Sequence, residues 1–156
     1  MATKIVFFIT ILAYSIIASQ TFMYILSLKQ LQLGLNAESY LEIRKLTDTL
    51  MRANFKYVIY TALLANLLLV IFTIQTPKTW LFIGASIAFV ALVADILLTL
   101  KGSLPINDVI NSWSANAIPA NWQSVREQWF TIFQYRQIAN IIGLLSLLLA
   151  AVFGTK

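Results

Sequence analysis

The sequence predicts an all-α fold: an integral membrane four-helix bundle whose second and fourth helices extend beyond the membrane on one side. Composition is the first reason, because the 156 residues are 60% hydrophobic and 11% charged, whereas soluble domains average about 45–50% apolar and about 25% charged residues. The second reason is that the apolar residues form four runs of roughly the length that crosses a bilayer as a helix. These runs lack the two-residue alternation of membrane strands. We expect one transmembrane domain, residues 1–156.

The first predicted span covers residues 5–28, a run with no charged residue between Lys4 and Lys29. A basic start followed by an apolar run is also typical of a signal peptide. However, this run continues well past the small residues around Ala18, where such a peptide would be cleaved. We therefore expect a retained helix.

The next two predicted spans are residues 57–75 and 79–100, and the connection between them is so short that they must form a helical hairpin. Asp95 is the one charged residue inside the third run. The fourth predicted span, residues 138–153, is short, but the residues before it can lengthen the helix. With that extension, all four reach the length that a bilayer requires.

Two long polar segments, residues 29–56 and 101–137, lie on the side opposite the hairpin. The first is expected to contain an amphipathic helix over about 37–56, with Asn36 as its N-cap and the second span as its continuation. The apolar residues predicted to form its inward stripe are Tyr40, Ile43, Leu46, Leu50, Met51 and Phe55.

The second polar segment is expected to contain a helix over about 121–137, with Asn121 placed to cap it. The residues predicted to share one face of this helix are Trp122, Val125, Trp129 and Phe133. We expect the helix to run without a break through Gly143 into the fourth span. Residues 102–119 are then predicted to form a loop.

Basic residues are divided unequally between the two sides of the membrane. Eight lie on the side of the long segments: Lys29, Arg44, Lys45, Arg52, Lys56, Lys101, Arg126 and Arg136. Three lie on the other side: Lys4, Lys78 and Lys156. The positive-inside rule predicts that the long segments are cytoplasmic and that both termini are outside. Because the basic residues flank apolar helices, the net charge of +5 indicates contact with anionic lipid headgroups rather than with nucleic acid.

A carboxylate inside a membrane span costs about 2.5–3.5 kcal/mol and is usually paired or functional. Asp95 lies near the wet end of the third span, and Arg136, at the start of the fourth, is its natural partner. We interpret this pair as a candidate site, with a structural ion pair as the alternative. The other spans each carry a polar side chain that favours interhelical hydrogen bonding: Gln20, Asn66 and Asn140.

Aromatic, amide and arginine side chains are concentrated in residues 104–136. Two interpretations stay open: an interfacial aromatic belt, or a lid that stacks on and hydrogen-bonds a flat aromatic or anionic ligand. The residues that support a lid are Asn107, Trp113, Trp122, Arg126, Trp129 and Arg136. We expect a lipid-accessible pocket, and the residues predicted to line it are Gln20, Asp95, Asn107, Trp129 and Arg136.

The chain has no cysteine and no histidine, which excludes disulfides, thiolate catalysis and the commonest metal ligands. It has no glycine-rich phosphate loop, no nucleophile elbow and no HExxH motif. Its six acidic residues show no clustered spacing of the kind that metal ligands have. We therefore expect neither a metal nor a cofactor.

The third span is followed by Pro105-Ile-Asn107, then by a tryptophan-rich stretch, and then by Trp129 seven residues before Arg136. This layout, with Trp113 and Trp122 in the middle stretch, resembles the anthrone oxygenase-like membrane proteins (domain of unknown function 1772). The resemblance covers roughly residues 97–153 by motif, and the first two helices by layout alone.

The resemblance implies a four-helix membrane fold and activity on anthrones without a metal or flavin. Members of that family usually have a histidine two residues before the arginine, where this chain has Gln134. An amide can form hydrogen bonds but cannot accept a proton at neutral pH. Asp95 is then the obvious substitute base, with Gln134 as a ligand-binding side chain.

Two functions from different classes fit these residues. The first is binding of a flat lipophilic aromatic, such as an anthrone, polyketide or quinone, with an oxygenase-like reaction in which Asp95 is catalytic. The second is a non-catalytic small subunit or scaffold of a larger membrane complex, with another membrane protein or a second copy as partner. A transporter or channel is less favoured, because one intramembrane acid gives no continuous polar pathway.

Overall fold

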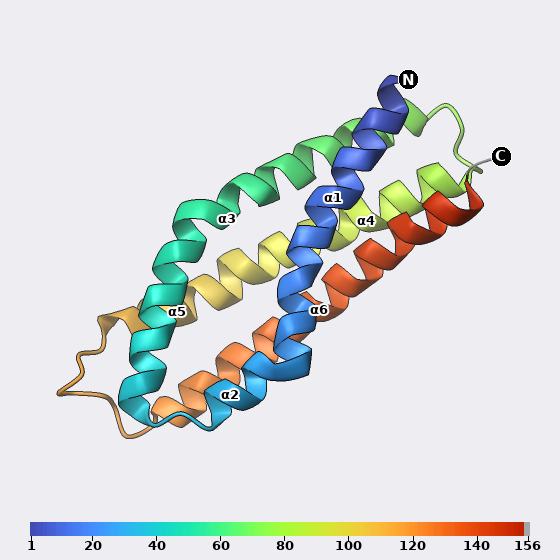
Figure 1. Ribbon diagram of the computed structural model, residues 1–156. Helices are drawn as coiled ribbons and strands as arrows, with labels where there is room; N and C mark the ends of the chain where they lie inside the picture. The colour runs from blue at the N-terminus through green and yellow to red at the C-terminus, as the bar shows by residue number, and fades with distance from the viewer. Residues whose placement is uncertain (155–156) are drawn as a thin grey trace.

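The computed structural model describes residues 1–154, and four long helical rods make up most of them (Figure 1). This confirms the all-α four-helix bundle. In chain order the elements are α1 (Ala2–Met23), the π-helical turn η1 (Tyr24–Leu28), α2 (Lys29–Leu33), α3 (Ala37–Thr73), α4 (Trp80–Leu98), the π-helical turn η2 (Thr99–Ser103), α5 (Leu104–Ser112) and α6 (Trp122–Phe153). The first rod is α1–η1–α2 and the third is α4–η2–α5.

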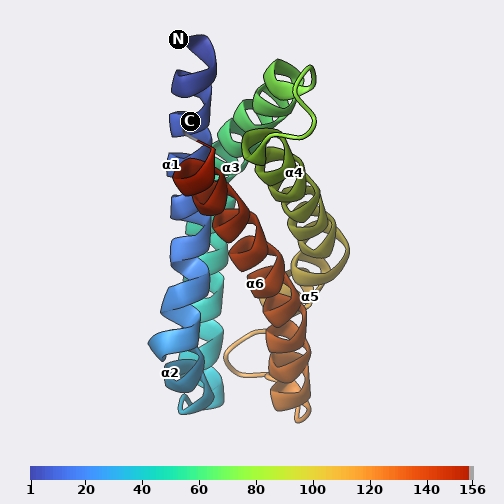
Figure 2. The ribbon, with the colours of Figure 1, turned by 90° about the vertical axis from the view of Figure 1, so that its right-hand side faces the viewer.

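The four rods form a closed ring of contacts, in which α1 and α4 each pack against both α3 and α6 (Figure 2). The start of α1, the end of α6 and the α3–α4 connection lie at one end of the bundle, as predicted (Figure 1). The longer connections lie at the opposite end. Lys156, which was counted among the basic residues of the first end, lies outside the described residues.

All four rods are long and apolar enough to cross a membrane. Large apolar side chains point outward along them, among them Phe8, Val90 and Val152, each about two-thirds exposed (67%, 67% and 68%). An outward apolar surface of this kind suits acyl chains rather than water. The protein is therefore a multi-pass integral membrane protein in contact with the lipid bilayer.

Two predicted helix features are confirmed. Asn36 caps α3, because its Oδ1 accepts a hydrogen bond from the Ser39 N–H at 2.9 Å. α6 runs unbroken from Trp122 to Phe153. Asn121 does precede α6, but its side chain makes no capping hydrogen bond.

The prediction of a loop over residues 102–119 is wrong for its first part. The third rod continues through η2 into α5 and ends only at Ser112. Pro105 lies in the first turn of α5, where its missing N–H costs little. The wider π-helical turn just before it absorbs the break that Lys101, Gly102 and Pro105 otherwise indicate.

The inward stripe predicted for the start of α3 is also partly wrong. Tyr40 is buried as expected, but Leu46 and Leu50 are 59% and 61% exposed. Arg44 and Asp48 are buried instead, at 3% and 6% exposed. Their partners on other helices, described below, turn this charged face inward and leave the leucines outside.

Two halves of the bundle differ in what they bury. The juxtamembrane half comprises residues 29–56 and residues 104–135; the other described residues form the membrane half. In the membrane half Tyr14 is fully buried and donates to the Ala88 carbonyl at 2.9 Å. A Cβ added at Gly143 would overlap the Tyr14 ring, and one added at Gly84 would overlap the α6 backbone at Ser146. Close packing therefore joins the helices there.

Candidate functional site

The predicted pairing of Asp95 with Arg136 is confirmed. Asp95 on α4 is 1% exposed, and its Oδ1 accepts a hydrogen bond from Arg136 Nε at 2.8 Å. The Arg136 side chain is 12% exposed and also donates to Ser103 Oγ at 3.3 Å. The pair joins the third rod to α6 where the two halves meet.

A second polar centre lies in the juxtamembrane half, between α3 and α5. Arg44 Nη2 donates to Asn107 Oδ1 at 2.7 Å, and Asn107 Nδ2 donates to Asp48 Oδ1 at 2.7 Å. The other carboxylate oxygen of Asp48 accepts from Asn111 Nδ2 at 2.7 Å and from Arg52 Nε at 2.8 Å. Asp48 is therefore fully engaged by neighbours that hold α3 against α5.

Arg52 extends this centre to the surface, because its Nη2 also donates to Asp108 Oδ1 at 2.7 Å. The side chains of Arg52 and Asp108 are 42% and 64% exposed. Because both groups are open to the surroundings, this outer ion pair contributes little stability.

Aromatic rings connect the two polar centres. Trp129 and Phe133 on α6 stack with ring centroids 4.9 Å apart and an interplanar angle of 13°, and Tyr24 packs beside them at 5.6 and 4.5 Å. The Arg44 guanidinium carbon lies 3.9 Å from the Trp129 ring centroid, and that of Arg136 lies 5.4 Å from the Phe133 centroid. Two arginines thus bracket a stacked pair of rings, an arrangement that cation–π attraction favours.

Arg126 lies on the same side of α6 as Trp129 and caps the C-terminal end of α2. Its Nη1 donates to the backbone carbonyls of Gln32 and Leu33 at 3.0 and 3.3 Å. The guanidinium carbon is 4.7 Å from the Trp122 ring centroid and 5.7 Å from that of Tyr40. These contacts hold α2 against α6 and place a second buried cation near Arg44.

Several buried polar atoms of the juxtamembrane half have no hydrogen-bond partner in the described part of the chain. They are Gln32 Oε1, Tyr40 Oη, Arg44 Nε, Arg126 Nε and Trp129 Nε1. Buried polar atoms are nearly always bonded, and each one left unpaired costs about 1–3 kcal/mol. The concentration of such atoms around Arg44 and Trp129 marks this region as the candidate site.

The structure brings together only some of the predicted site residues. Trp129 is one of the stacked rings, and Arg136 lies over the other. Asn107 is connected to Trp129 through Arg44. Trp113 and Trp122 are in a neighbouring apolar cluster around Tyr40, so they form part of a core.

Two predicted residues lie apart from this region. The Gln20 amide donates to Met51 Sδ at 3.3 Å, a contact between α1 and α3. Gln134 is exposed on α6. Neither makes a hydrogen bond to the stacked rings or to the two polar centres among the described residues.

Asn66 and Asn140 are both buried between helices of the membrane half. In the amide orientation that satisfies both of its polar atoms, Asn66 donates to the Ala85 carbonyl and accepts from the Phe89 N–H, each at 3.0 Å. This confirms an interhelical hydrogen bond for Asn66. Asn140 is 3% exposed, and its Oδ1 has no partner within residues 1–154.

Sequence reasoning missed Arg44, Asp48, Tyr24 and Tyr40 as site residues. A signal for two of them was present, since Arg44, Asp48 and Arg52 recur at exact four-residue steps and therefore share one helix face. The apolar residues of the same segment were instead assigned to the inside. Nothing in the local pattern singles out the two tyrosines.

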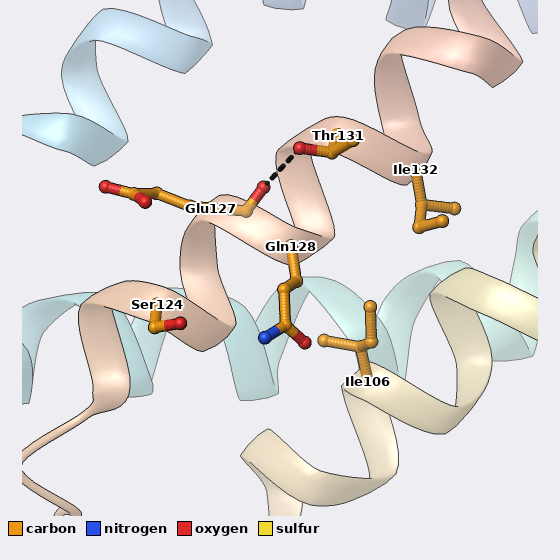
Figure 3. Close-up of a pocket in the computed structure, with 6 residues that line it drawn as sticks. All are labelled: Ile106, Ser124, Glu127, Gln128, Thr131 and Ile132. Carbon is orange, nitrogen blue, oxygen red and sulfur yellow. Dashed lines mark hydrogen bonds between the residues drawn. The ribbon is translucent and has the colours of Figure 1, made fainter.

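A shallow groove of about 420 Å³ lies between α5 and α6 (Figure 3). Its lining residues are Ile106, Ser124, Glu127, Gln128, Thr131 and Ile132. None of these is a residue predicted for the pocket, and the α6 members lie on a different face from Trp129 and Phe133. The predicted pocket residues are instead in contact with other side chains, as described above.

Comparison with known proteins gives no relative: no family model, no curated protein and no solved structure matches this chain.

Proposed function

We propose that this membrane protein binds a flat lipophilic aromatic compound in its juxtamembrane half, where Arg44 meets Trp129. The observation that carries the proposal is a pair of buried donors, Arg44 Nε and Trp129 Nε1, that have no partner among residues 1–154. The Arg44 guanidinium carbon lies 3.9 Å from the Trp129 ring centroid. Donors fixed beside stacked rings suit a planar ligand that carries acceptor oxygens. Because Phe133 and the Arg44 guanidinium already lie against Trp129, the ligand must displace Arg44 from the ring face to stack there, and the donors then orient it.

The depth of this region supports a lipophilic ligand. About 20 helical residues span the hydrocarbon of a bilayer. Counted from the α3–α4 connection, this length places the opposite boundary near Ala53 on α3 and Leu98 on α4, and a similar count from the end of α6 reaches Phe133. Trp129 then lies about one turn farther out, at the level of the headgroups. A compound dissolved in the bilayer reaches this level without crossing water.

The resemblance to the anthrone oxygenase-like proteins supports the same ligand class.

We also propose that the juxtamembrane half lies in the cytoplasm and that both termini lie outside. Exposed basic side chains near the boundary, such as Lys56 and Lys101, favour this orientation. Cysteine labelling of Lys101→Cys in sealed vesicles tests it. Labelling only by a reagent added outside would show that the protein has the opposite orientation.

Binding is tested with anthraquinone, added to the protein in phosphatidylcholine nanodiscs and followed by quenching of tryptophan fluorescence. We expect saturable binding that Trp129→Leu weakens by about tenfold or more, the scale of one lost stacking contact with its hydrogen bond. Trp80→Leu is the matched control, because Trp80 is 54% exposed and is the first residue of α4, at the opposite end of the bundle. Absence of saturable binding, or equal loss in both variants, would contradict the proposal.

The oxygenase-like extension assigns proton abstraction to Asp95. Because the described contacts pair this carboxylate with Arg136, the ligand must displace or share that guanidinium to reach it. Turnover of an anthrone with dioxygen by wild-type protein and by Asp95→Asn tests this step. Equal rates, both at the uncatalysed background, would exclude catalysis while leaving ligand binding intact.

One observation favours the second candidate, a subunit or scaffold. Leu46 and Leu50 are exposed on α3 in the juxtamembrane half, where a lipid-facing surface is not expected from helix depth. Purification in mild detergent at native expression tests this candidate. A stoichiometric partner that Leu46→Glu releases would support it; a lone species stabilised by anthraquinone would argue against it.

A further inference from the structure

We infer that the aromatic ligand is an anion, with one carboxylate or phenolate group held between Arg126 and Arg44. This inference rests on the proposed function and specifies the chemical class of its ligand. Two observations support it independently: the balance of buried charge in the juxtamembrane half, and the balance of unpartnered donors and acceptors.

The buried charge of this half is not balanced. Arg44 and Arg126 are 3% and 6% exposed, and the buried acid among the described residues of this half is Asp48, at 6%. Asp48 already has Arg52 as its ion-pair partner, and neither Arg44 nor Arg126 forms an ion pair within residues 1–154. Buried charges are normally paired. The buried charges, two arginines against one aspartate, therefore leave a net charge of +1, which a single anionic group would balance.

Arg126 is where that counter-charge is most needed. The described contacts of its guanidinium are two backbone carbonyls, of Gln32 and Leu33, and the ring faces of Trp122 and Tyr40. Carbonyls and rings carry only partial negative charge, so they solvate the cation without neutralising it. Arg44 has Asn107 at 2.7 Å, which connects it to Asp48 through an amide. Arg126 has no such connection among the contacts described.

The unpartnered atoms show the same imbalance. Four can donate a hydrogen bond, namely Tyr40 Oη, Arg44 Nε, Arg126 Nε and Trp129 Nε1, and one, Gln32 Oε1, can only accept. Arg44 packs on Trp129, and Arg126 lies over Tyr40. Gln32 connects the two pairs, because its backbone carbonyl accepts from Arg126 and its amide donates to the Tyr24 hydroxyl, which also accepts from Arg44. A ligand that satisfies them must be rich in acceptors. An ionised oxygen group meets this requirement, and its hydrogen bonds to guanidinium are the strongest available.

The test compares two probes with the same rings, anthraquinone-2-carboxylate and the neutral anthraquinone-2-carboxamide, in phosphatidylcholine nanodiscs. We expect the anion to bind about tenfold more tightly or better, the effect of one charge-assisted hydrogen bond. Arg126→Gln should bring the ratio of the two affinities close to one, and Arg126→Lys should keep part of it. Lys101→Gln, which removes a charge from an exposed side chain, should leave the ratio unchanged.

Each outcome decides a different statement. Equal binding of the two probes by wild-type protein overturns the anion and leaves the proposed function standing, whereas binding of neither overturns both. This comparison needs no variant, so it holds even if Arg126→Gln fails to fold. Nanodiscs that contain phosphatidylglycerol provide the last arm. Because an anionic bilayer also repels the carboxylate probe, binding is corrected for its partition into empty nanodiscs of the same lipid. If the preference is abolished after that correction, the anion held here is a lipid headgroup, which overturns the aromatic acid.

Discussion

The membrane half and the juxtamembrane half of this bundle are joined by different interactions. In the membrane half the helices meet through small residues, such as Gly84 and Gly143, and through single neutral hydrogen bonds such as that of Asn66. In the juxtamembrane half they meet through buried charges, with Arg44 and Asp48 both turned inward. Lipid gives helices no hydrophobic reason to associate, so close packing must hold the first half. The second half is joined by hydrogen-bonded charges instead, and these are the groups with which the proposed ligand would interact.

The boundary between the halves should be the most sensitive position. Asp95→Asn keeps the shape of the side chain but leaves the Arg136 guanidinium without its counter-charge. Breaking one partner of a buried pair costs roughly 3–5 kcal/mol, and partial exposure of Arg136 places the expected loss near the lower limit. Denaturant titration in detergent micelles measures it. The double variant Asp95→Leu with Arg136→Met should recover most of the loss; a loss below about 1 kcal/mol in Asp95→Asn would show that the pair is solvated.

Packing in the membrane half is the next largest effect expected. In Gly84→Val the new side chain meets the α6 backbone at Ser146, which cannot rotate away, so α4 and α6 must separate. Overpacking of this kind costs about 1–3 kcal/mol. Gly34→Ala is the matched control, because a Cβ there meets only ordinary contacts at 3.6 and 3.7 Å. Thermal unfolding in micelles should shift for the first variant alone, and equal shifts would show that α4 and α6 can adjust.

The sequence predicts the membrane half better than the juxtamembrane half, because the two halves are joined by different interactions. Spans, hairpin and the Asp95–Arg136 pair were predictable because apolar run length and an isolated intramembrane charge are strong signals. The inward charges of α3 were not, since a periodic pattern assigns apolar residues to the inside and cannot show that Asn107 and Asn111 will face Asp48. This contact depends on α5, which continues the third rod through η2 although Lys101, Gly102 and Pro105 all indicate the end of a helix.

Tyr40→Phe should change the stability of the juxtamembrane half by less than the two variants above. The Tyr40 ring is fully buried in the juxtamembrane half, and its hydroxyl has no partner in the described part of the chain. Removing an unbonded buried hydroxyl while keeping the ring should be neutral or stabilise the protein by up to about 1 kcal/mol. Denaturant titration of Tyr40→Phe measures this in ligand-free micelles. Destabilisation by more than about 1 kcal/mol would mean that the hydroxyl is bonded in the protein as purified, by water or by a retained ligand.

The outer ion pair, Arg52 with Asp108, should contribute least to stability, although its geometry matches that of the buried pair of Arg136 with Asp95. Arg52 Nη2 lies 2.7 Å from Asp108 Oδ1, against 2.8 Å between Arg136 Nε and Asp95 Oδ1. Asp108 is 64% exposed, so Asp108→Asn should lower the free energy of unfolding by less than about 1 kcal/mol, with a dependence on salt. The same titration as for Asp95→Asn measures it. Equal losses in the two variants would mean that burial does not separate the pairs, and the distinction between inner and outer charges would fail.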